Sequence, residues 1–181
     1  MSTRSYIAKQ IGDNLYKGIY CHSDGYLSHN GALLVDIYNT PEKVDEVLSL
    51  GDLSFLTAKL YPDPSKPHSF NYNERQEGVT VAYGRDRGEP GTAAKEFDFN
   101  ELVENADWCD FVYVFSEDGK WMYFRPWEEG QTLKDVETDL EKEYANYGVK
   151  RPEGYYGFIS DSVIENCEPL QSNDSDFVQS M

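Results

Sequence analysis

The 181-residue sequence has 16 basic and 33 acidic side chains, which give it a formal net charge of −17. Proteins bind phosphates and anionic lipid headgroups through clustered Lys and Arg, so this composition disfavours direct contact with nucleic acid or a membrane. An aromatic content of 14% argues against a fully disordered acidic chain. The length fits one folded domain around one core.

Local patterns in the first quarter of the chain predict a β-hairpin followed by two helices. Two short strands, at 5–9 and 15–21, flank a turn at 12–14 that is made of Gly, Asp and Asn. The dense apolar residues of 27–38 predict a compact helix. Thr40 and Pro41 form an N-cap and first-turn signal for a second helix, which we expect to end at Gly51.

The middle of the chain alternates between loops and single elements. Three prolines in 60–77 predict a surface loop, and the alternating apolar residues of 78–85 predict a half-buried strand. Residues 85–92, rich in glycine and charge, predict a second loop. Asp98 and Glu101 form a capping-box pattern at the start of a short helix.

The last predicted elements are a hairpin and a helix. Strands at 110–116 and 120–125 are joined through Asp118-Gly119, a strong hairpin signal. We expect Thr132, with Asp135 three residues later, to cap the final helix, and Gly148 to end it. Its apolar residues follow helical spacing: Leu133, Val136, Leu140, Tyr144 and Tyr147.

The order ββααβαββα predicts an α+β fold with a mainly antiparallel sheet of about five strands and helices packed on one face. We expect residues 1–150 to form a single domain and residues 151–181 to form an acidic, partly ordered C-terminal tail. Three widely spaced cysteines indicate reduced thiols, and no long apolar run or leader-like segment is visible, so we expect a cytosolic protein.

The negative charge is concentrated in the second half of the sequence. Residues 1–100 have a balance of −4, whereas residues 101–181 have a balance of −13. Such a surface can be an ordinary solvated face, or it can imitate phosphates and enter the basic cleft of a nucleic-acid-binding protein. Under the second interpretation, the predicted partner-binding residues are acidic side chains with nearby aromatic anchors: Asp107, Trp108, Asp110, Glu117, Asp118, Trp127, Asp135, Asp139 and Glu143.

A second group of reactive side chains lies near the N-terminus. Cys21-His22-Ser23-Asp24-Gly25-Tyr26 begins at the last residue of a predicted strand and continues into a turn, with Arg4 upstream. Neighbouring residues on a strand point to opposite faces, so Cys21 and His22 do not readily pair as nucleophile and base, and a local turn explains the motif. We therefore assign no catalytic residue, cofactor or metal, and treat Arg4, His22, Asp24 and Tyr26 as a motif of unknown role.

Two segments carry a resemblance: Ser2-Thr3-Arg4-Ser5-Tyr6-Ile7 and Ile19 through Tyr26. They resemble a family of small acidic proteins of bacteriophages and mobile elements, some of which are similar to anti-CRISPR inhibitors of Cas9. The similarity continues through 40–56 and 78–89 and covers about the first half of the chain. Ser23 stands where the family pattern usually has a large aromatic residue. The resemblance implies a phage accessory role in the bacterial host cytosol.

Together these features predict a non-enzymatic inhibitor of a host defence nuclease. The expected partner is a basic nucleic-acid-binding protein such as a Cas9 effector, which holds nucleic acid in positively charged channels. Two alternatives stay open: a small hydrolase or nuclease centred on the Cys-His-x-Asp-Gly-Tyr motif, and a non-inhibitory acidic interaction scaffold. Arg4, Lys9 and Lys17 leave a local DNA contact open, although the overall charge disfavours it. The sequence sets no oligomeric state.

Overall fold

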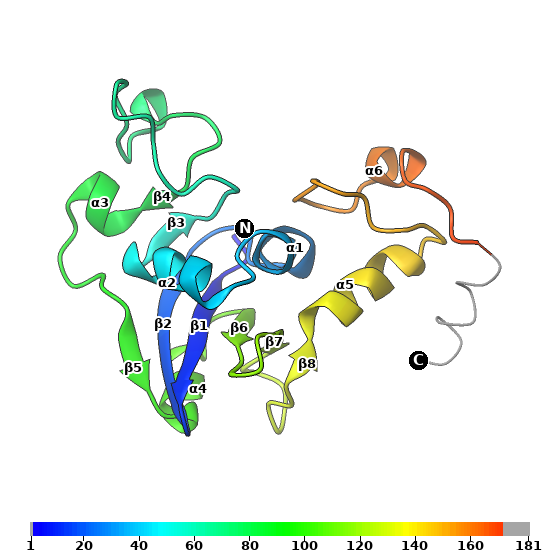
Figure 1. The fold of residues 1–181 in the computed structure, drawn as a ribbon, viewed down its shortest axis with the longest axis horizontal. Coiled ribbons are helices and arrows are strands. Elements are labelled where there is room, and N and C mark those ends of the chain that lie inside the picture. Colours follow the sequence, from blue (N-terminus) through cyan, green and yellow to red (C-terminus); the bar gives the residue numbers. More distant parts are fainter. Residues whose placement is uncertain (1, 172–181) are drawn as a thin grey trace.

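The computed structural model describes residues 2–171. It has an α+β fold built on a mixed sheet, with the strands in the order β4-β3-β2-β1-β6-β7-β8 and with β5 also paired to β2 (Figure 1). The strands are β1 (Ser5–Gly12), β2 (Leu15–Cys21), β3 (Leu53–Phe55), β4 (Val81–Ala82), β5 (Lys95–Phe97), β6 (Phe111–Phe115), β7 (Trp121–Phe124) and β8 (Lys134–Asp135).

The helical elements are mostly short. They are the π-helical turn η1 (Leu27–Gly31), α1 (Ala32–Asp36), α2 (Pro41–Ser49), the 3₁₀ turn η2 (Tyr72–Glu74), α3 (Tyr83–Arg87), α4 (Phe99–Asn105), α5 (Val136–Ala145) and α6 (Asp161–Glu165). Thr40 caps α2 through a bond from the Lys43 amide, and Asp98 and Glu101 form a complete capping box at α4. These two helix starts confirm the sequence prediction.

The sheet differs from the expected mainly antiparallel sheet of about five strands. The β1–β2 and β6–β7 hairpins are confirmed, with Gly119 at φ +80° in the second turn. However, β1 pairs with β6 in parallel, and β2 pairs with β3 in parallel. Three further strands, β3, β5 and β8, contain only two or three residues each, too few to show an alternating pattern.

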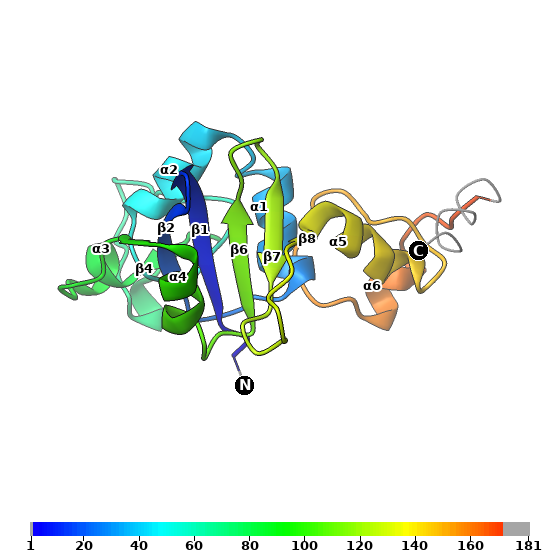
Figure 2. The same ribbon diagram turned by 90° about the horizontal axis from the view of Figure 1, so that it is seen from below.

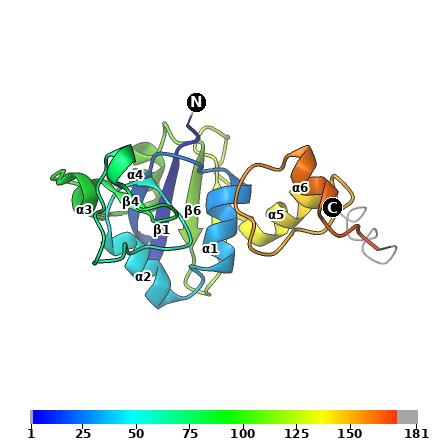
Figure 3. The same cartoon turned by 90° about the horizontal axis from the view of Figure 1, so that it is seen from above.

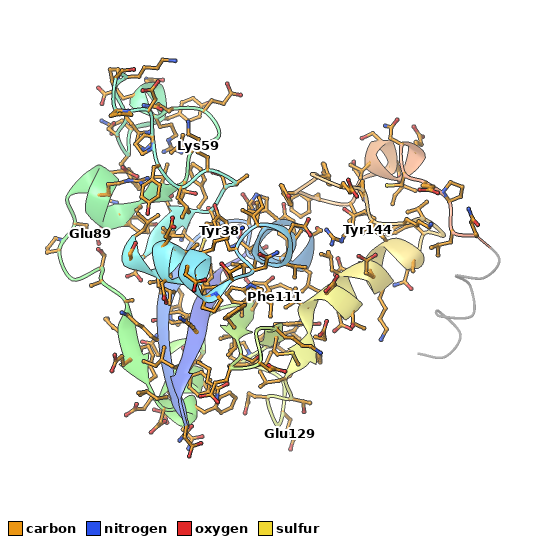
Figure 4. All side chains as sticks on the ribbon, viewed as in Figure 1. Tyr38, Lys59, Glu89, Phe111, Glu129 and Tyr144 are labelled. Atoms are coloured by element: carbon orange, nitrogen blue, oxygen red, sulfur yellow. The ribbon has the colours of Figure 1, made fainter. Side chains whose placement is uncertain are left out.

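Helices cover both faces of the sheet, which corrects the expectation of one covered face. Figure 3 shows α1 and α2 in front of the strands, and Figure 2 shows α4 in front of them from the opposite side. The larger core contains Ile7 and Ile19 with apolar residues of α1, α2 and α5, among them Tyr144. Phe111 of β6 and Tyr38, which lies between α1 and α2, belong to the same core (Figure 4). The neighbouring strand residues Tyr6 and Ala8 point the other way and pack with Leu102 of α4.

Two element boundaries also differ from the prediction. The expected strand over 78–85 is limited to β4, because residues 83–87 form α3. Two side chains of α3 bond the backbone before the helix: the Asp86 carboxylate accepts the Ala82 N–H at 2.8 Å, and Arg85 donates to the Thr80 carbonyl at 2.6 Å. The N-cap of α5 is Asp135, which accepts the Thr138 N–H at 2.8 Å. The expected cap, Thr132, is exposed and precedes β8.

Residues 151–171 pack back onto the rest of the protein. The Phe158 ring stacks on Tyr26 with a centroid distance of 4.3 Å, and the Gly157 N–H donates to the Ser28 carbonyl at 3.0 Å. The Arg151 guanidinium bonds both carboxylate oxygens of Asp36 at 2.8 and 3.0 Å. The remainder of the predicted tail, residues 172–181, lies outside the described residues, and the domain limit at residue 150 stays a prediction.

Candidate functional site: the Trp108 patch

Residues from three distant segments meet on one surface, which we name the Trp108 patch. Trp108 is 52% exposed, and its ring lies on Tyr20 with a centroid distance of 4.6 Å. The guanidinium carbon of Arg4 is 5.6 Å from the Trp108 ring centroid, within cation–π range. The patch consists of Arg4, Tyr20, His22, Asp107, Trp108 and Asp110.

The parallel pairing of β1 and β6 positions this patch. Ser5 is in register with Phe111, so the residues before the two strands lie side by side. The Arg4 N–H donates to the Asp110 carboxylate at 3.0 Å, and the Asp110 N–H donates to the Arg4 carbonyl at 2.9 Å. The fold therefore joins part of the N-terminal motif to part of the predicted acidic interface, which the sequence treated as separate sites.

Tyr20 and His22 occupy the same face of β2 and its extension. The Tyr20 Oη and His22 Nδ1 atoms are 2.7 Å apart. Burial raises the pKa of Tyr20 to about 12 despite the nearby Arg4 charge, so the phenol stays protonated at neutral pH and can donate to the imidazole. The sequence interpretation did not include Tyr20 among the functional residues. Its position two residues before His22 was the available signal, because residues i and i+2 of a strand lie on the same face.

The remainder of the motif builds a turn. Asp24 has φ +57°, and a Cβ on Gly25 would lie 2.7 Å from the Ser5 Cβ, so the close approach of the two segments requires glycine. Tyr26 lies on Phe158, away from the Trp108 patch contacts. Of the four motif residues, the patch therefore contains Arg4 and His22 but not Asp24 or Tyr26.

Cys21 lies in the core on the opposite side of β2 from His22. It is 0% exposed, and its Sγ donates to the Ser23 carbonyl at 3.7 Å and accepts the Asn30 side-chain amide at 3.5 Å. Burial raises the pKa of the Cys21 thiol to about 11. A thiol that is buried and protonated at neutral pH is a poor nucleophile, which argues against the hydrolase centred on this motif.

The remaining predicted interface residues lie elsewhere. Glu117 and Asp118 are exposed in the β6–β7 turn, where Asp118 bonds the Ser116 hydroxyl. This turn is at the other end of β6 from the Trp108 patch, roughly 17 Å away at about 3.3 Å per residue. Trp127 is 62% exposed, and the Arg125 guanidinium carbon lies 5.5 Å from its ring centroid.

Three predicted acids belong to α5 or its cap, and all three are partly buried. Asp135 caps the helix, and Asp139 accepts the Tyr123 hydroxyl at 2.7 Å. Burial raises the pKa of Glu143, against the effect of the Arg125 charge. Because two of the three carboxylates bond other groups of the protein and none of the three residues is fully exposed, they do not form an exposed charged line along the helix.

A groove of about 1060 Å³ lies between the end of α1, the start of α5, the β6–β7 turn and residues 151–156. Val35, Trp121 and Tyr156 contribute its apolar surface. Its bases are Lys120 and Arg151. Its acids are Asp36, Asp135, Glu137, Glu141 and Glu153.

No protein-family model, curated protein or solved structure matches this chain. Within residues 2–171, no helix is both long and apolar enough to cross a membrane. The same residues contain no group of three or more His, Cys, Asp or Glu side chains arranged to hold a metal ion.

Proposed function

We propose that this chain is a non-enzymatic binding protein that occupies the basic, nucleic-acid-binding surface of another protein. The observation that carries the proposal is the Trp108 patch, where an exposed tryptophan lies between two exposed acids, Asp107 and Asp110. Tryptophan, tyrosine and arginine are the residues that most often dominate binding energy in protein interfaces. The patch has two acids against one arginine, Arg4, and the whole chain has a net charge of −17, so a positively charged partner is favoured.

The partner class comes from the sequence resemblance: a Cas9-type defence nuclease in a bacterial cytosol. Such an effector holds its guide–target duplex in a positive channel and reads the PAM with arginines. A protein with a net charge of −17 is attracted to these surfaces over a distance comparable to the Debye length, about 10 Å at 0.1 M salt. Inhibition then follows from occupying the surface that DNA needs.

Binding of the purified chain to a guide-loaded Cas9-type effector tests the proposal. We expect Trp108→Ala to weaken binding by at least about tenfold, because removing a central aromatic anchor costs about 2 kcal/mol or more. Trp127→Ala is the comparison variant, because it removes another exposed tryptophan, 62% exposed, that was also a predicted anchor but lies outside the Trp108 patch. We expect it to weaken binding less than Trp108→Ala does. Equal binding by wild type and Trp108→Ala, or binding that does not weaken between about 50 and about 200 mM salt, would count against the proposal.

A further inference from the structure

The groove beside α5 combines a hollow with an uneven charge distribution. It has five acidic side chains against two basic ones, and its volume of about 1060 Å³ is at the upper end of the range for small-molecule pockets, roughly 300–1,000 Å³. Such pockets are mostly apolar, whereas seven of the fifteen residues that line this groove are charged. The charge of its lining therefore fits a charged polypeptide segment better than a small apolar ligand.

The protein already holds one guanidinium in this groove, and that contact shows which group the lining recognises. Arg151 bonds Asp36 through two nitrogens and Glu141 through Nε at 3.0 Å, and its side chain is only 11% exposed. Burial opposes the Arg151 charge, but these hydrogen bonds to carboxylates raise its pKa. Planar, two-nitrogen pairing with carboxylates is the geometry in which arginine differs from lysine.

Two other acids of the groove remain exposed. Glu137 lies in the first turn of α5 and Glu153 lies in the 151–156 segment, and both residues are exposed. Besides Arg151, the only base among the described lining residues is Lys120, a single positive charge in the β6–β7 turn. The open part of the groove therefore has an excess of negative charge after Arg151 is neutralised by its two partners.

We infer that the groove receives an arginine-bearing segment of the partner protein, beside the guanidinium that Arg151 already places there. The inference rests on the proposed function. It adds the groove as a second surface that contacts the partner, besides the Trp108 patch. A basic partner segment would present its guanidinium groups to Glu137 and Glu153 and lay their apolar stems along Val35 and Tyr156, which are partly exposed in the groove.

An oligoarginine peptide titrated into the full chain, followed by amide chemical shifts, tests the inference. We expect shifts at groove residues such as Lys120 and Glu141, and binding at least about fivefold weaker in Glu137→Lys/Glu153→Lys. The matched control is Glu77→Lys/Glu165→Lys, which changes the net charge equally at exposed acids outside the groove lining. Should the lysine variant unfold, Glu137→Gln/Glu153→Gln gives the same comparison against Glu77→Gln/Glu165→Gln.

Equal affinities of the groove and control variants, shifts confined to other surfaces, or no binding of the peptide would overturn the inference. Binding measurements with the effector distinguish failure of this inference from failure of the proposed function. If only the groove contact is wrong, the groove variant binds the effector as the wild type does and Trp108→Ala still weakens binding. If the proposed function is wrong, the wild-type chain itself does not bind the effector.

Discussion

Gly25 shows how one residue holds the N-terminal motif in place. Its N–H donates to the Thr3 carbonyl at 2.8 Å, and an added Cβ would lie 2.9 Å from that same oxygen. We expect Gly25→Ala to lower the free energy of unfolding by about 1–3 kcal/mol, the usual cost of overpacking. Gly12→Ala is the control, because its Cβ would meet Leu15 at an ordinary 3.6 Å, and denaturant unfolding of both variants measures the difference. Equal stability of the two variants would contradict the steric argument.

Glu143 gives a pH-dependent prediction at the same scale. Burial raises its pKa above the ordinary value of 4.5, so its ionised form is less favourable in the folded than in the unfolded protein. The stability cost is therefore present above the folded pKa and disappears as the pH falls below the unfolded value. We expect Glu143→Gln to raise the Tm by about 1–3 °C at pH 7 and to leave it unchanged near pH 4. A destabilising effect at pH 7 would show that the attraction to Arg125 outweighs burial.

At the scale of elements, the start of α5 distinguishes two candidate caps. Asp135 accepts the Thr138 N–H, whereas Thr132 precedes β8. Removing an N-cap costs about 1 kcal/mol, so we expect Asp135→Ala to destabilise the protein by that amount and Thr132→Ala by less than about 0.5 kcal/mol. Thermal unfolding of the two variants measures this, and the reverse ranking would restore Thr132 as the cap.

Elements with strong local signals were predictable from the sequence. The Asp118-Gly119 hairpin and the helix starts at Thr40 and Asp98 depend on residues within a few positions of each other. The parallel β1–β6 pairing was not predictable, because it joins residues about a hundred positions apart and no local pattern encodes it. The Trp108 patch depends on that pairing. Its members were named from the sequence, apart from Tyr20, but their convergence was not.

At the scale of the whole molecule, Arg151 connects residues 151–171 to α1 and α5. Charge-assisted hydrogen bonds contribute about 1.5–3 kcal/mol each, and Arg151 makes them to Asp36 and Glu141. We expect Arg151→Ala to speed amide hydrogen exchange in 151–171 by at least about tenfold while leaving β1 and β2 protected. Lys150→Ala is the control, because its 3.8 Å ion pair with Glu168 is exposed. Unchanged exchange in the Arg151 variant would mean that other contacts fix this segment.

Competition between this chain and PAM-containing duplex DNA for a guide-loaded Cas9-type effector tests the proposed function most directly. The wild-type chain is expected to displace the DNA, and Asp107→Lys/Trp108→Ala is expected to lose that displacement while keeping its fold. Displacement by the wild type should also weaken as the salt concentration rises, because the attraction is electrostatic. DNA binding that is undisturbed by a saturating concentration of the folded wild-type chain would contradict the account.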